Sequence, residues 1–464
     1  MKIFNTLTRE KDEFKPIKEG EVKIYACGPT VYNYIHIGNA RPLCVFDVLR
    51  RYLEWQGYKV TFVQNFTDID DKLIKKANEE GLTVPEIAER YIKEFWTDAK
   101  GLNVREATVH PRATENIKEI QDIISALMEK GYAYESGGDV YYRAKKFEDY
   151  GKLSHQPLED LEAGARIGVA EIKEDPMDFC LWKGAKPGEP YWESPWGNGR
   201  PGWHIECSAM ACRYLGKTID IHCGGLDLIF PHHENEIAQS ECCNGVPFAK
   251  YWMHNGFLNI DNRKMSKSLG NFFTVREISE KYDLQVLRFF MLSAHYRSPL
   301  NFSADLMAAA KNGLDRILTA AERLHDLADA AEGSMTDAEK ENFAASKEYV
   351  EKFEAAMEDD ANTADAVSAV FELVKFINVN SSEQNSKEYL QALYQRLETL
   401  CDVLGIIIEK KEEILDSDIE ALIAERQAAR KEKNFARADE IRDMLLEQGI
   451  ILEDTREGVK WKRA

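Results

Sequence analysis

The segment that most constrains the fold is residues 22–66, where two apolar runs flank a helical pattern. The run "VKIYACG" (residues 22–28) has the composition of a buried strand, and residues 40–57 place apolar side chains at helical spacing before a glycine. The run "KVTFVQNF" (residues 59–66) then predicts a second strand. A strand, a helix and a strand in this order form a βαβ unit, which predicts an α/β protein with a parallel sheet.

Length and composition exclude several classes of protein. With 464 residues the chain is too long for one ordinary core, and its 44% apolar and 30% charged residues are typical of globular domains. The first residues lack the apolar core of a secretory signal, and no run of about 18 apolar residues predicts a membrane span, so we expect a cytoplasmic protein with no membrane partner. The net charge of −20 argues against a generic nucleic-acid coat protein but leaves room for a local basic face. The nine cysteines are expected to be thiols or metal ligands.

The pattern changes several times after the first βαβ unit. From about residue 113 to residue 199, a helix is followed by segments rich in glycine, proline and tryptophan, which predict an insertion with irregular, aromatic-lined loops. "TIDIHCGG" (residues 218–225) resumes the strand pattern, and "HHENEIAQSECC" predicts the helix that follows. Beyond residue 303 most segments predict the helices of a bundle, and residues 428–437 begin a more basic end of the chain.

The motif "HIGN" follows the first strand and begins the first helix. Free backbone N–H groups and the helix dipole at such a place favour an anion, and His36 and Asn39 can donate hydrogen bonds to a phosphate. Gly38 lets a nucleotide approach the backbone closely. On its own, the motif is also compatible with an ordinary helix start that binds no ligand.

A second motif, "KMSKS" (residues 264–268), lies in a stretch whose serines and glycine favour a loop. The ammonium groups of Lys264 and Lys267 could close over a triphosphate and neutralise charge as the α-phosphate is attacked. A solvated basic loop is the alternative interpretation.

Together these motifs resemble the two signatures of the class I aminoacyl-tRNA synthetases, a His-Ile-Gly-His type tetrapeptide and a Lys-Met-Ser-Lys-Ser pentapeptide. The pentapeptide matches without change, whereas the tetrapeptide ends in Asn39, a mild departure because asparagine can still donate a hydrogen bond. The resemblance implies an α/β fold with a Rossmann-like (HUP-type) parallel-sheet catalytic domain. We expect this domain in residues 1–115 and 200–302, with a connective insertion in 116–199, a helical bundle in 303–416 and a small C-terminal anticodon-binding domain in 417–464.

A third set of residues has the composition of a metal site. His232 and Glu236 are four residues apart, so they share one face of a helix, while Cys27 and Cys207 stand in distant segments. Two thiolates, one imidazole and one carboxylate suit zinc better than a hard cation. From the residues alone, the cysteines could equally belong to the core, and "HHENE" could be a polar first turn of a helix.

The surrounding segments resemble the cysteinyl-tRNA synthetase family from the first strand to the C-terminus. They are "YACGPTVYNYIHIGN", "NFTDIDDK", "GRPGWHIECSAM", "DLIFPHHENEIAQS", "MSKSLGNFFTVR" and the final "ARADEIRDMLLEQGIILEDTREGVKWKR". The resemblance implies one zinc ion per subunit in a pocket for L-cysteine, held by Cys27, Cys207, His232 and Glu236. It also implies that Gly28, Thr30 and Trp203 line this pocket and that Asp227 faces the substrate ammonium group.

The resemblance predicts a monomeric ligase that uses magnesium-bound ATP to form cysteinyl-adenylate and then transfers cysteine to its tRNA. His36, Gly38, Asn39, Lys264 and Lys267 would bind ATP, and all of these except Gly38 would stabilise charge during the reaction. Zinc would favour the substrate sulfur over a serine hydroxyl, which shape alone discriminates poorly.

Three other functions were weighed against this one. A cysteine ligase of the mycothiol type would act on a non-tRNA amine acceptor, and that type lacks the basic C-terminal segment of this chain. A tRNA-binding paralogue without catalysis would have no use for a thiol-selective metal. A zinc protease would need histidines at both i and i+4, which "HHENE" does not supply.

The remaining polar residues near these motifs have more ordinary interpretations. Asp68, Asp70 and Asp71 are expected to form turns and helix caps. His233 and Glu234 lie off the proposed ligand face and are interpreted as hydrogen-bonding support or as solvated groups.

The other cysteines and the C-terminal basic residues complete the predictions. Cys223 stands where the resemblance predicts glycine, and we expect a bystander thiol rather than a competing ligand. Helix-face or core positions are expected for Cys212, Cys242 and Cys243. The last basic residues form a candidate anticodon-binding patch, which consists of Lys460, Trp461, Lys462 and Arg463. A disordered basic tail is the alternative interpretation of this segment.

Overall fold

The computed structural model describes most of the chain. It covers residues 1–156, 172–261, 263–264, 272–409, 416–431, 434–447, 450–455 and 458–463. Close contacts divide the chain into two compact units, Met1–Ile408 and Glu409–Ala464. Among the described helices, none combines the length and the apolar character needed to cross a membrane.

The first unit is built around a four-stranded parallel sheet with the strand order β10-β9-β3-β4. These strands are β3 (Glu21–Ala26), β4 (Lys59–Gln64), β9 (Ile219–Gly225) and β10 (Ala249–Asn255). Helix α1 (Ile37–Trp55) connects β3 to β4, which confirms the predicted βαβ unit. Because all four strands run in the same direction, their carboxyl ends meet at one edge of the sheet, where open α/β sheets bind ligands.

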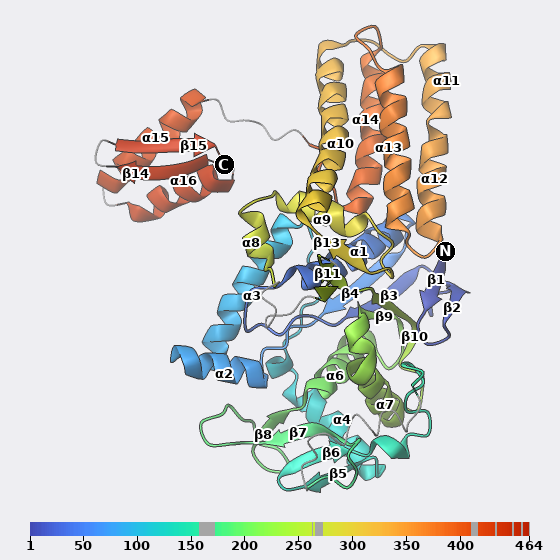
Figure 1. Cartoon of the computed structure of the whole chain (residues 1–464), viewed down its shortest axis with the longest axis vertical. Helices are drawn as coiled ribbons and strands as arrows, with labels where there is room; N and C mark the ends of the chain where they lie inside the picture. Colours follow the sequence, from blue (N-terminus) through green and yellow to red (C-terminus); the bar gives the residue numbers. More distant parts are fainter. Residues whose placement is uncertain are drawn as a thin grey trace. The chain divides into compact units, whose positions relative to one another are not determined.

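Further helices and short strands surround this sheet (Figure 1). Helix α2 begins where Asp70 accepts a hydrogen bond from Lys72 N over 2.8 Å, so Asp70 is a cap as expected. Asp68 accepts a hydrogen bond from Thr114 N over 3.0 Å, and Asp71 forms an ion pair with Lys183. The elements are β1 (Lys2–Asn5), β2 (Glu10–Glu13), α2 (Asp71–Glu80), α3 (Val84–Gly101), α6 (Trp203–Leu215), α7 (Glu234–Asn244), β11 (Leu258–Ile260), β12 (Arg263–Lys264), α8 (Val275–Ser279), α9 (Leu284–Leu292) and β13 (Leu300–Phe302).

The segment between β4 and β9 contains more regular structure than the sequence predicts. After α4 (Ile117–Glu129), four strands form an antiparallel sheet: β5 (Ala133–Ser136), β6 (Asp139–Tyr142), β7 (Phe179–Gly184) and β8 (Gly199–Pro201). The prediction of irregular loops is therefore wrong for these residues. Gly137 and Gly138 both have positive φ angles, 62° and 87°, and make the tight turn of the β5–β6 hairpin.

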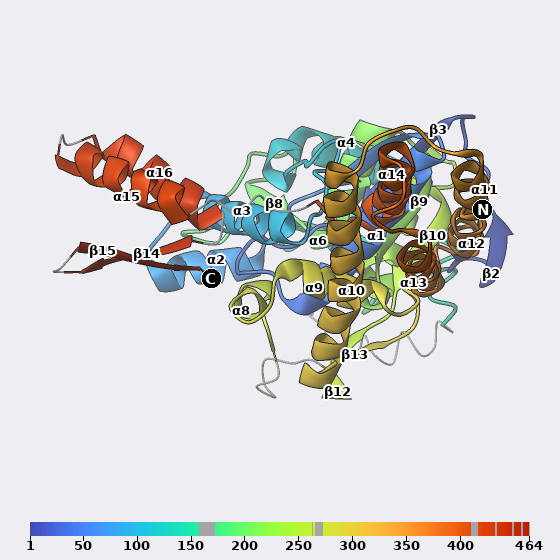
Figure 2. The same ribbon diagram turned by 90° about the horizontal axis from the view of Figure 1, so that it is seen from above.

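Five helices form a bundle at the opposite end of the first unit from the antiparallel sheet (Figure 1). Helix α10 packs on α9, and the two helices are seen next to each other in the view from above (Figure 2). Leu314, Leu373, Leu393 and Leu397 are among the buried side chains of this bundle. The helices are α10 (Ala304–Ala330), α11 (Asp337–Ala345), α12 (Lys347–Glu358), α13 (Thr363–Asn380) and α14 (Lys387–Leu404).

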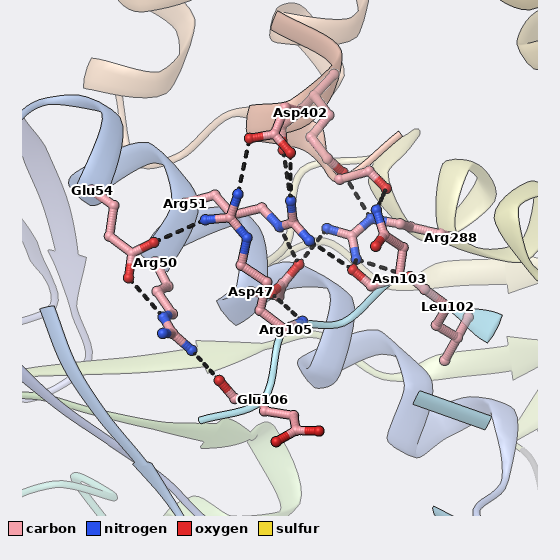
Figure 3. A network of polar contacts seen from close by, with 12 residues as sticks. Asp47, Arg50, Arg51, Glu54, Leu102, Asn103, Arg105, Glu106, Arg288 and Asp402 are labelled. Atoms are coloured by element: carbon pink, nitrogen blue, oxygen red, sulfur yellow. Dashed lines mark hydrogen bonds and ion pairs between the residues drawn. The ribbon is translucent and has the colours of Figure 1, made fainter. Parts of the chain in front are cut away.

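A network of charged side chains joins the bundle to the helix that begins with the "HIGN" motif (Figure 3). Asp47 on α1 accepts hydrogen bonds from Arg51 Nε over 2.8 Å and from Arg288 Nη2 over 2.6 Å. Arg51 Nη1 also donates to Asp402 Oδ1 of α14 over 2.9 Å, and Arg288 Nε of α9 donates to the carbonyl of Leu404 over 2.7 Å. Helices α1, α9 and α14 are thus held together by the same few charged side chains.

The described residues of the second unit form two helices and one hairpin. Its helices are α15 (Asp416–Lys431) and α16 (Phe435–Glu447), and its antiparallel strands are β14 (Ile450–Thr455) and β15 (Gly458–Arg463). Trp461 pairs with Leu452 and packs against a small apolar cluster that includes Ile441. The basic C-terminal segment is a strand, so the alternative of a disordered tail does not hold for residues 458–463.

Candidate metal centre and substrate cavity

Four side chains from three segments converge at the carboxyl edge of the central sheet. Cys27 directly follows β3, and Cys207 lies in the first half of α6. Glu236 is in the first turn of α7, and His232 precedes that helix. One donor atom from each of these four residues lies within 4.8 Å of the others, so the fold brings together all the residues of the predicted metal site.

His232 lies in a short π-helical turn, Ile229–His233, that leads directly into α7, rather than in the regular α-helix that the sequence predicts. Helix α7 begins at Glu234, and Phe230 has the extended backbone angles φ −137° and ψ 133°. The residue before a proline is biased away from the helical region, and Phe230 precedes Pro231. The pairing nevertheless survives, because His232 Nε2 lies 3.0 Å from Glu236 Oε1.

The distances among these donor atoms fit a tetrahedral zinc ion. Two sulfurs that each lie about 2.3 Å from zinc at tetrahedral angles are about 3.8 Å apart, and a sulfur and a carboxylate oxygen are about 3.6 Å apart. The Sγ atoms of Cys27 and Cys207 are 3.9 Å apart, and Cys27 Sγ lies 3.5 Å from Glu236 Oε1. The donor set and its spacing therefore both suit zinc.

The charges at the site are strongly coupled. Burial alone would raise the pKa of Glu236, but His222 and His232 lower this pKa to about 2. Burial alone would lower the pKa of His232, but Glu236 and Cys207 raise it to about 10. A hydrogen bond from Cys27 lowers the pKa of Cys207 to about 6, while burial raises the pKa of Cys27. One thiol is thus prepared as a thiolate ligand, and a metal would displace the proton of the other.

Two histidines that the sequence did not single out lie beside the four residues: His222, which is buried, and His204, which is partly buried. His222 Nε2 bonds Glu236 Oε2 over 2.8 Å, and His204 Nδ1 lies 2.8 Å from His232 Nδ1. Contacts of this kind orient metal ligands. His204 lies three residues before Cys207 on α6, which was a usable signal, whereas a single histidine within strand β9 resembles any core residue.

The two residues beside the ligands are buried rather than solvated. His233 Nδ1 lies 2.8 Å from His254 Nε2, and its Nε2 lies 3.3 Å from Cys27 Sγ. Glu234 accepts a hydrogen bond from Ser154 N over 2.8 Å. Of the two interpretations of His233 and Glu234, hydrogen-bonding support holds.

Cys27, His222, His233 and Glu236 form a second set of donor atoms within 4.8 Å, and Cys223 belongs to neither set found in the described part of the chain. Cys223 Sγ instead donates to the carbonyl of Tyr25 over 3.5 Å, and burial raises the pKa of its thiol well above the usual value. Both observations support the expectation of a bystander thiol.

A cavity of about 450 Å³ opens beside the metal centre. Trp203 at this cavity is 43% exposed, and its ring centroid lies 4.4 Å from that of His232. Asp227 also lines the cavity, and its Oδ1 lies 2.4 Å from the position that a Cβ atom on Gly225 would take. The lining includes these predicted substrate-binding residues: Gly28, Thr30, His36, Gly38, Asn39, Trp203 and Asp227, together with Cys27.

His36 and Asn39, which also line this cavity, shape the start of α1. His36 is the N-cap with extended backbone angles, and its N–H donates to Asn39 Oδ1 over 3.2 Å. Asn39 N donates in turn to the carbonyl of His36 over 2.8 Å. Of the two signature lysines, Lys264 contributes its backbone to β12, while its side chain and all of Lys267 lie outside the described residues.

Three family models match successive parts of the chain. The model of the "tRNA synthetases class I (C) catalytic domain" matches residues 13–312. The "DALR domain" model matches residues 352–409, and the "Cysteinyl-tRNA ligase anticodon binding domain" model matches residues 413–461.

Curated relatives match the chain over its whole length. A protein of Lachnospira eligens named "Cysteine--tRNA ligase" is 64% identical over 472 residues, and the alignment covers 100% of both chains. Proteins of the same name from Lachnoclostridium phytofermentans and Clostridioides difficile are 62% and 59% identical, again over 100% of both chains.

Solved structures of other synthetases share the fold. A methionyl-tRNA synthetase of Mycobacterium tuberculosis in complex with methionyl-adenylate has a TM-score of 0.58 at 15% identity and covers 83% of this chain and 89% of its own. A leucyl-tRNA synthetase of Agrobacterium radiobacter in a ternary complex has a TM-score of 0.61 at 11% identity and covers 85% of each chain. At these identities the likeness shows an α/β class I fold.

Proposed function

The chain belongs to the cysteinyl-tRNA synthetase family of class I ligases, and on this basis we propose how its cavity carries out the ATP-dependent attachment of L-cysteine to tRNA. Cysteine would bind beside the metal centre, ATP would bind toward His36 and Asn39, and the two would react between these sites. The observation that carries the proposal is that one cavity is lined both by Cys27 and by residues at the start of α1.

The part of the cavity that binds cysteine would be defined by a zinc ion and by the residues next to it. Cys27, Cys207, His232 and Glu236 would hold the ion. When bound, zinc would supply a bond to the substrate sulfur that a neutral serine hydroxyl cannot match. Gly28 and Thr30 would contact the substrate backbone, because both line the cavity next to Cys27.

Trp203 and Asp227 would complete the recognition of the amino acid. The indole of Trp203 lies against the imidazole of His232, so it would cover the substrate side chain and exclude water from it. Asp227 would accept hydrogen bonds from the substrate ammonium group, since this residue lines the cavity. This arrangement would leave the substrate carboxylate directed toward the ATP end.

The activation step would depend on charge stabilisation rather than on a protein nucleophile. The substrate carboxylate would attack the α-phosphate of magnesium-bound ATP, forming cysteinyl-adenylate and releasing pyrophosphate. His36 and Asn39 would donate hydrogen bonds to the phosphates, and Gly38 would let the nucleotide approach the backbone. Lys264 and Lys267 would neutralise the charge that develops on the leaving pyrophosphate.

In the second step, the terminal adenosine hydroxyl of the tRNA would attack the adenylate. The second unit would bind the anticodon, which is supported by the match of residues 413–461 to an anticodon-binding domain. The same match argues against the mycothiol-type alternative. The basic patch around Trp461 stays a proposal for the residues that contact the anticodon bases.

The decisive experiment is ATP–pyrophosphate exchange with cysteine or serine, before and after removal of the metal. Cysteine should support exchange and serine should not, and metal removal should abolish the exchange until zinc is restored. Equal exchange with serine, or full cysteine-dependent exchange in metal-free protein, would contradict the proposed zinc selection. A Cys207→Ser variant should retain the fold and lose metal.

A further inference from the structure

Three buried polar residues, Asn65, Thr67 and Glu206, form a chain of hydrogen bonds that we call the brace. Asn65 Nδ2 donates to Thr67 Oγ1 over 3.4 Å, and Thr67 Oγ1 donates to Glu206 Oε2 over 3.1 Å. The three residues are only 1%, 2% and 1% exposed. Asn65 and Thr67 follow β4, whereas Glu206 lies on α6, so the brace joins two elements that are distant in sequence.

Each end of the brace lies at a residue that is adjacent in sequence to one of the two cysteines of the candidate metal centre. Asn65 Oδ1 accepts a hydrogen bond from the N–H of Gly28 over 2.9 Å, and Gly28 directly follows Cys27. At the other end, Glu206 directly precedes Cys207. The brace therefore links the backbone beside one thiol to the backbone beside the other.

Backbone contacts make the attachment to the first thiol close and fixed. Thr67 N donates to the carbonyl of Pro29 over 3.2 Å, and Val31 N donates to the carbonyl of Thr67 over 3.1 Å. A Cβ atom on Gly28 would come within 1.6 Å of the carbonyl oxygen of Asn65, so only glycine allows the two segments to lie this close. The position of Cys27 thus follows the position of the residues after β4.

The amide of Asn65 also touches the second thiol directly. Cys207 Sγ lies 3.9 Å from Asn65 Oδ1, the same oxygen that accepts the N–H of Gly28. One side chain is therefore in contact with both segments that carry a thiol. Its amide orientation is fixed, because the oxygen must face Gly28 and the NH₂ group must face Thr67.

We propose that Asn65, Thr67 and Glu206 are positioning residues that set the spacing of the two thiols, and through it the affinity for zinc and for substrate cysteine. The inference rests on the proposed zinc centre, but these three residues would contact neither the phosphates of ATP nor the reacting carboxylate. The observed Sγ–Sγ distance of 3.9 Å is close to the value of about 3.8 Å that a tetrahedral zinc ion requires. Without the brace, the loop of Cys27 and helix α6 can shift relative to each other.

The test is a Thr67→Val variant, which removes the hydroxyl that both accepts and donates while nearly conserving volume. Loss of contacts that orient metal ligands typically weakens metal binding by about tenfold to 100-fold, and we expect that loss of zinc affinity in a competition titration with a chromophoric chelator. In protein loaded with Co²⁺, the thiolate-to-metal absorption bands should change in energy or intensity. KM for cysteine should rise in the exchange assay, while KM for ATP should not change.

Two control variants separate positioning from general damage to the fold. Thr67→Ser keeps the hydroxyl, so it should restore most of the metal affinity. Thr363 is as buried as Thr67, at 1% exposed, and donates a single hydrogen bond to the carbonyl of Leu292 over 3.0 Å, away from the cavity. Thr363→Val should destabilise the protein to a similar degree and leave zinc affinity and KM for cysteine unchanged.

The outcomes distinguish this inference from the proposed function. If the unmodified protein binds zinc and discriminates cysteine from serine, but Thr67→Val has the same zinc affinity and the same Co²⁺ spectrum, the brace is refuted and the zinc centre stands. If the unmodified protein discriminates cysteine without any metal, the zinc centre itself is refuted. Should Thr67→Val fail to fold, Glu206→Met removes the acceptor at the other end of the brace, and Glu206→Gln, which keeps a carbonyl acceptor, is its matched control.

Discussion

Replacement of Asp47 by asparagine should strongly destabilise the first unit. The Asp47 side chain is 2% exposed, and its two oxygens accept hydrogen bonds from Arg51 Nε, Arg288 Nη2 and the backbone N–H of Arg105 (Figure 3). Asparagine has nearly the same shape but carries no charge, and its NH₂ group must face at least one of these donors. The substitution therefore leaves two buried guanidinium groups without their shared counter-ion.

The magnitude follows from the burial of this pair. Removing one partner of a buried ion pair costs about 3–5 kcal/mol, because the other partner stays buried and uncompensated. Arg288 is fully buried, and burial already lowers the pKa of Arg51, so neither cation can regain water without moving. We expect Asp47→Asn to lower the free energy of unfolding of the first unit by this amount.

Asp402 provides a matched control within the same network. It accepts a hydrogen bond from the same Arg51 over 2.9 Å, but its side chain is 59% exposed. Exposed ion pairs contribute less than about 1 kcal/mol to stability, so Asp402→Asn should lower the free energy of unfolding by less than this amount. The two variants make the same chemical change to two carboxylates that bind one arginine, and they differ mainly in burial.

The assay is chemical denaturation followed by tryptophan fluorescence. Trp461 is the single tryptophan after residue 408, so the signal reports mainly on the first unit. Equal losses of stability for Asp47→Asn and Asp402→Asn would refute the argument that burial decides the contribution of a charge in this network. A loss below about 1 kcal/mol for Asp47→Asn would refute it as well.

Three further predictions concern other parts of the chain. Gly405 and Gly81 both end helices at φ 66°, so alanine at either site should cost about 1–2 kcal/mol of backbone strain. In the same denaturation assay, Gly405→Ala should destabilise the protein clearly more than Gly81→Ala, because the new Cβ atom would overlap the guanidinium of Arg288. Burial lowers the pKa of His110 to about 4 from an unfolded value of about 6.5. The unfolded chain therefore binds a proton at His110 more readily than the folded protein does. The free energy of unfolding should be highest above pH 6.5 and should fall by up to about 3 kcal/mol as the pH falls toward 4. His110 Nε2 accepts the N–H of Ala107, a bond that protonation removes, and a His110→Gln variant should show a correspondingly flatter dependence of unfolding free energy on pH. Removal of the second unit should leave cysteine-dependent pyrophosphate exchange unchanged and greatly reduce tRNA charging, and unchanged charging would contradict a role of that unit in tRNA binding.

The parts of the fold that the sequence predicts well are those set by local periodicity. Strands β3 and β4 and helix α1 lie within a few residues of their predicted bounds, because alternation and helical spacing are properties of neighbouring residues. The hairpin of β5 and β6 also had a local signal, a Gly-Gly pair between two β-rich runs, which was overlooked among the surrounding glycines and tryptophans.

The site was predicted less completely, for a physical reason. Cys27, Cys207, His232 and Glu236 were recognisable because their segments resemble a known family and their donor atoms suit one metal. The contacts that orient these ligands come from residues that are spaced irregularly in the sequence, such as His222 and Asn65. A buried asparagine or histidine in a strand or loop has no distinctive pattern, so its partner can be known only from the fold.

The four proposed zinc ligands come from both halves of the catalytic domain. Cys27 comes from the half that precedes the antiparallel sheet, whereas Cys207, His232 and Glu236 come from the half that follows it. Strands β3 and β9 pair across this division at only three positions, from Ile24 to Ala26. Strand pairing alone therefore gives a short contact between the two halves at the carboxyl edge of the sheet. Four ligands on one ion would extend this contact between the halves beyond the last strand residues. The brace between Asn65 and Glu206 also links the two halves. The proposed cysteine pocket would therefore form only when the two halves are correctly assembled, and the geometry proposed to select sulfur would depend on the packing that stabilises the domain.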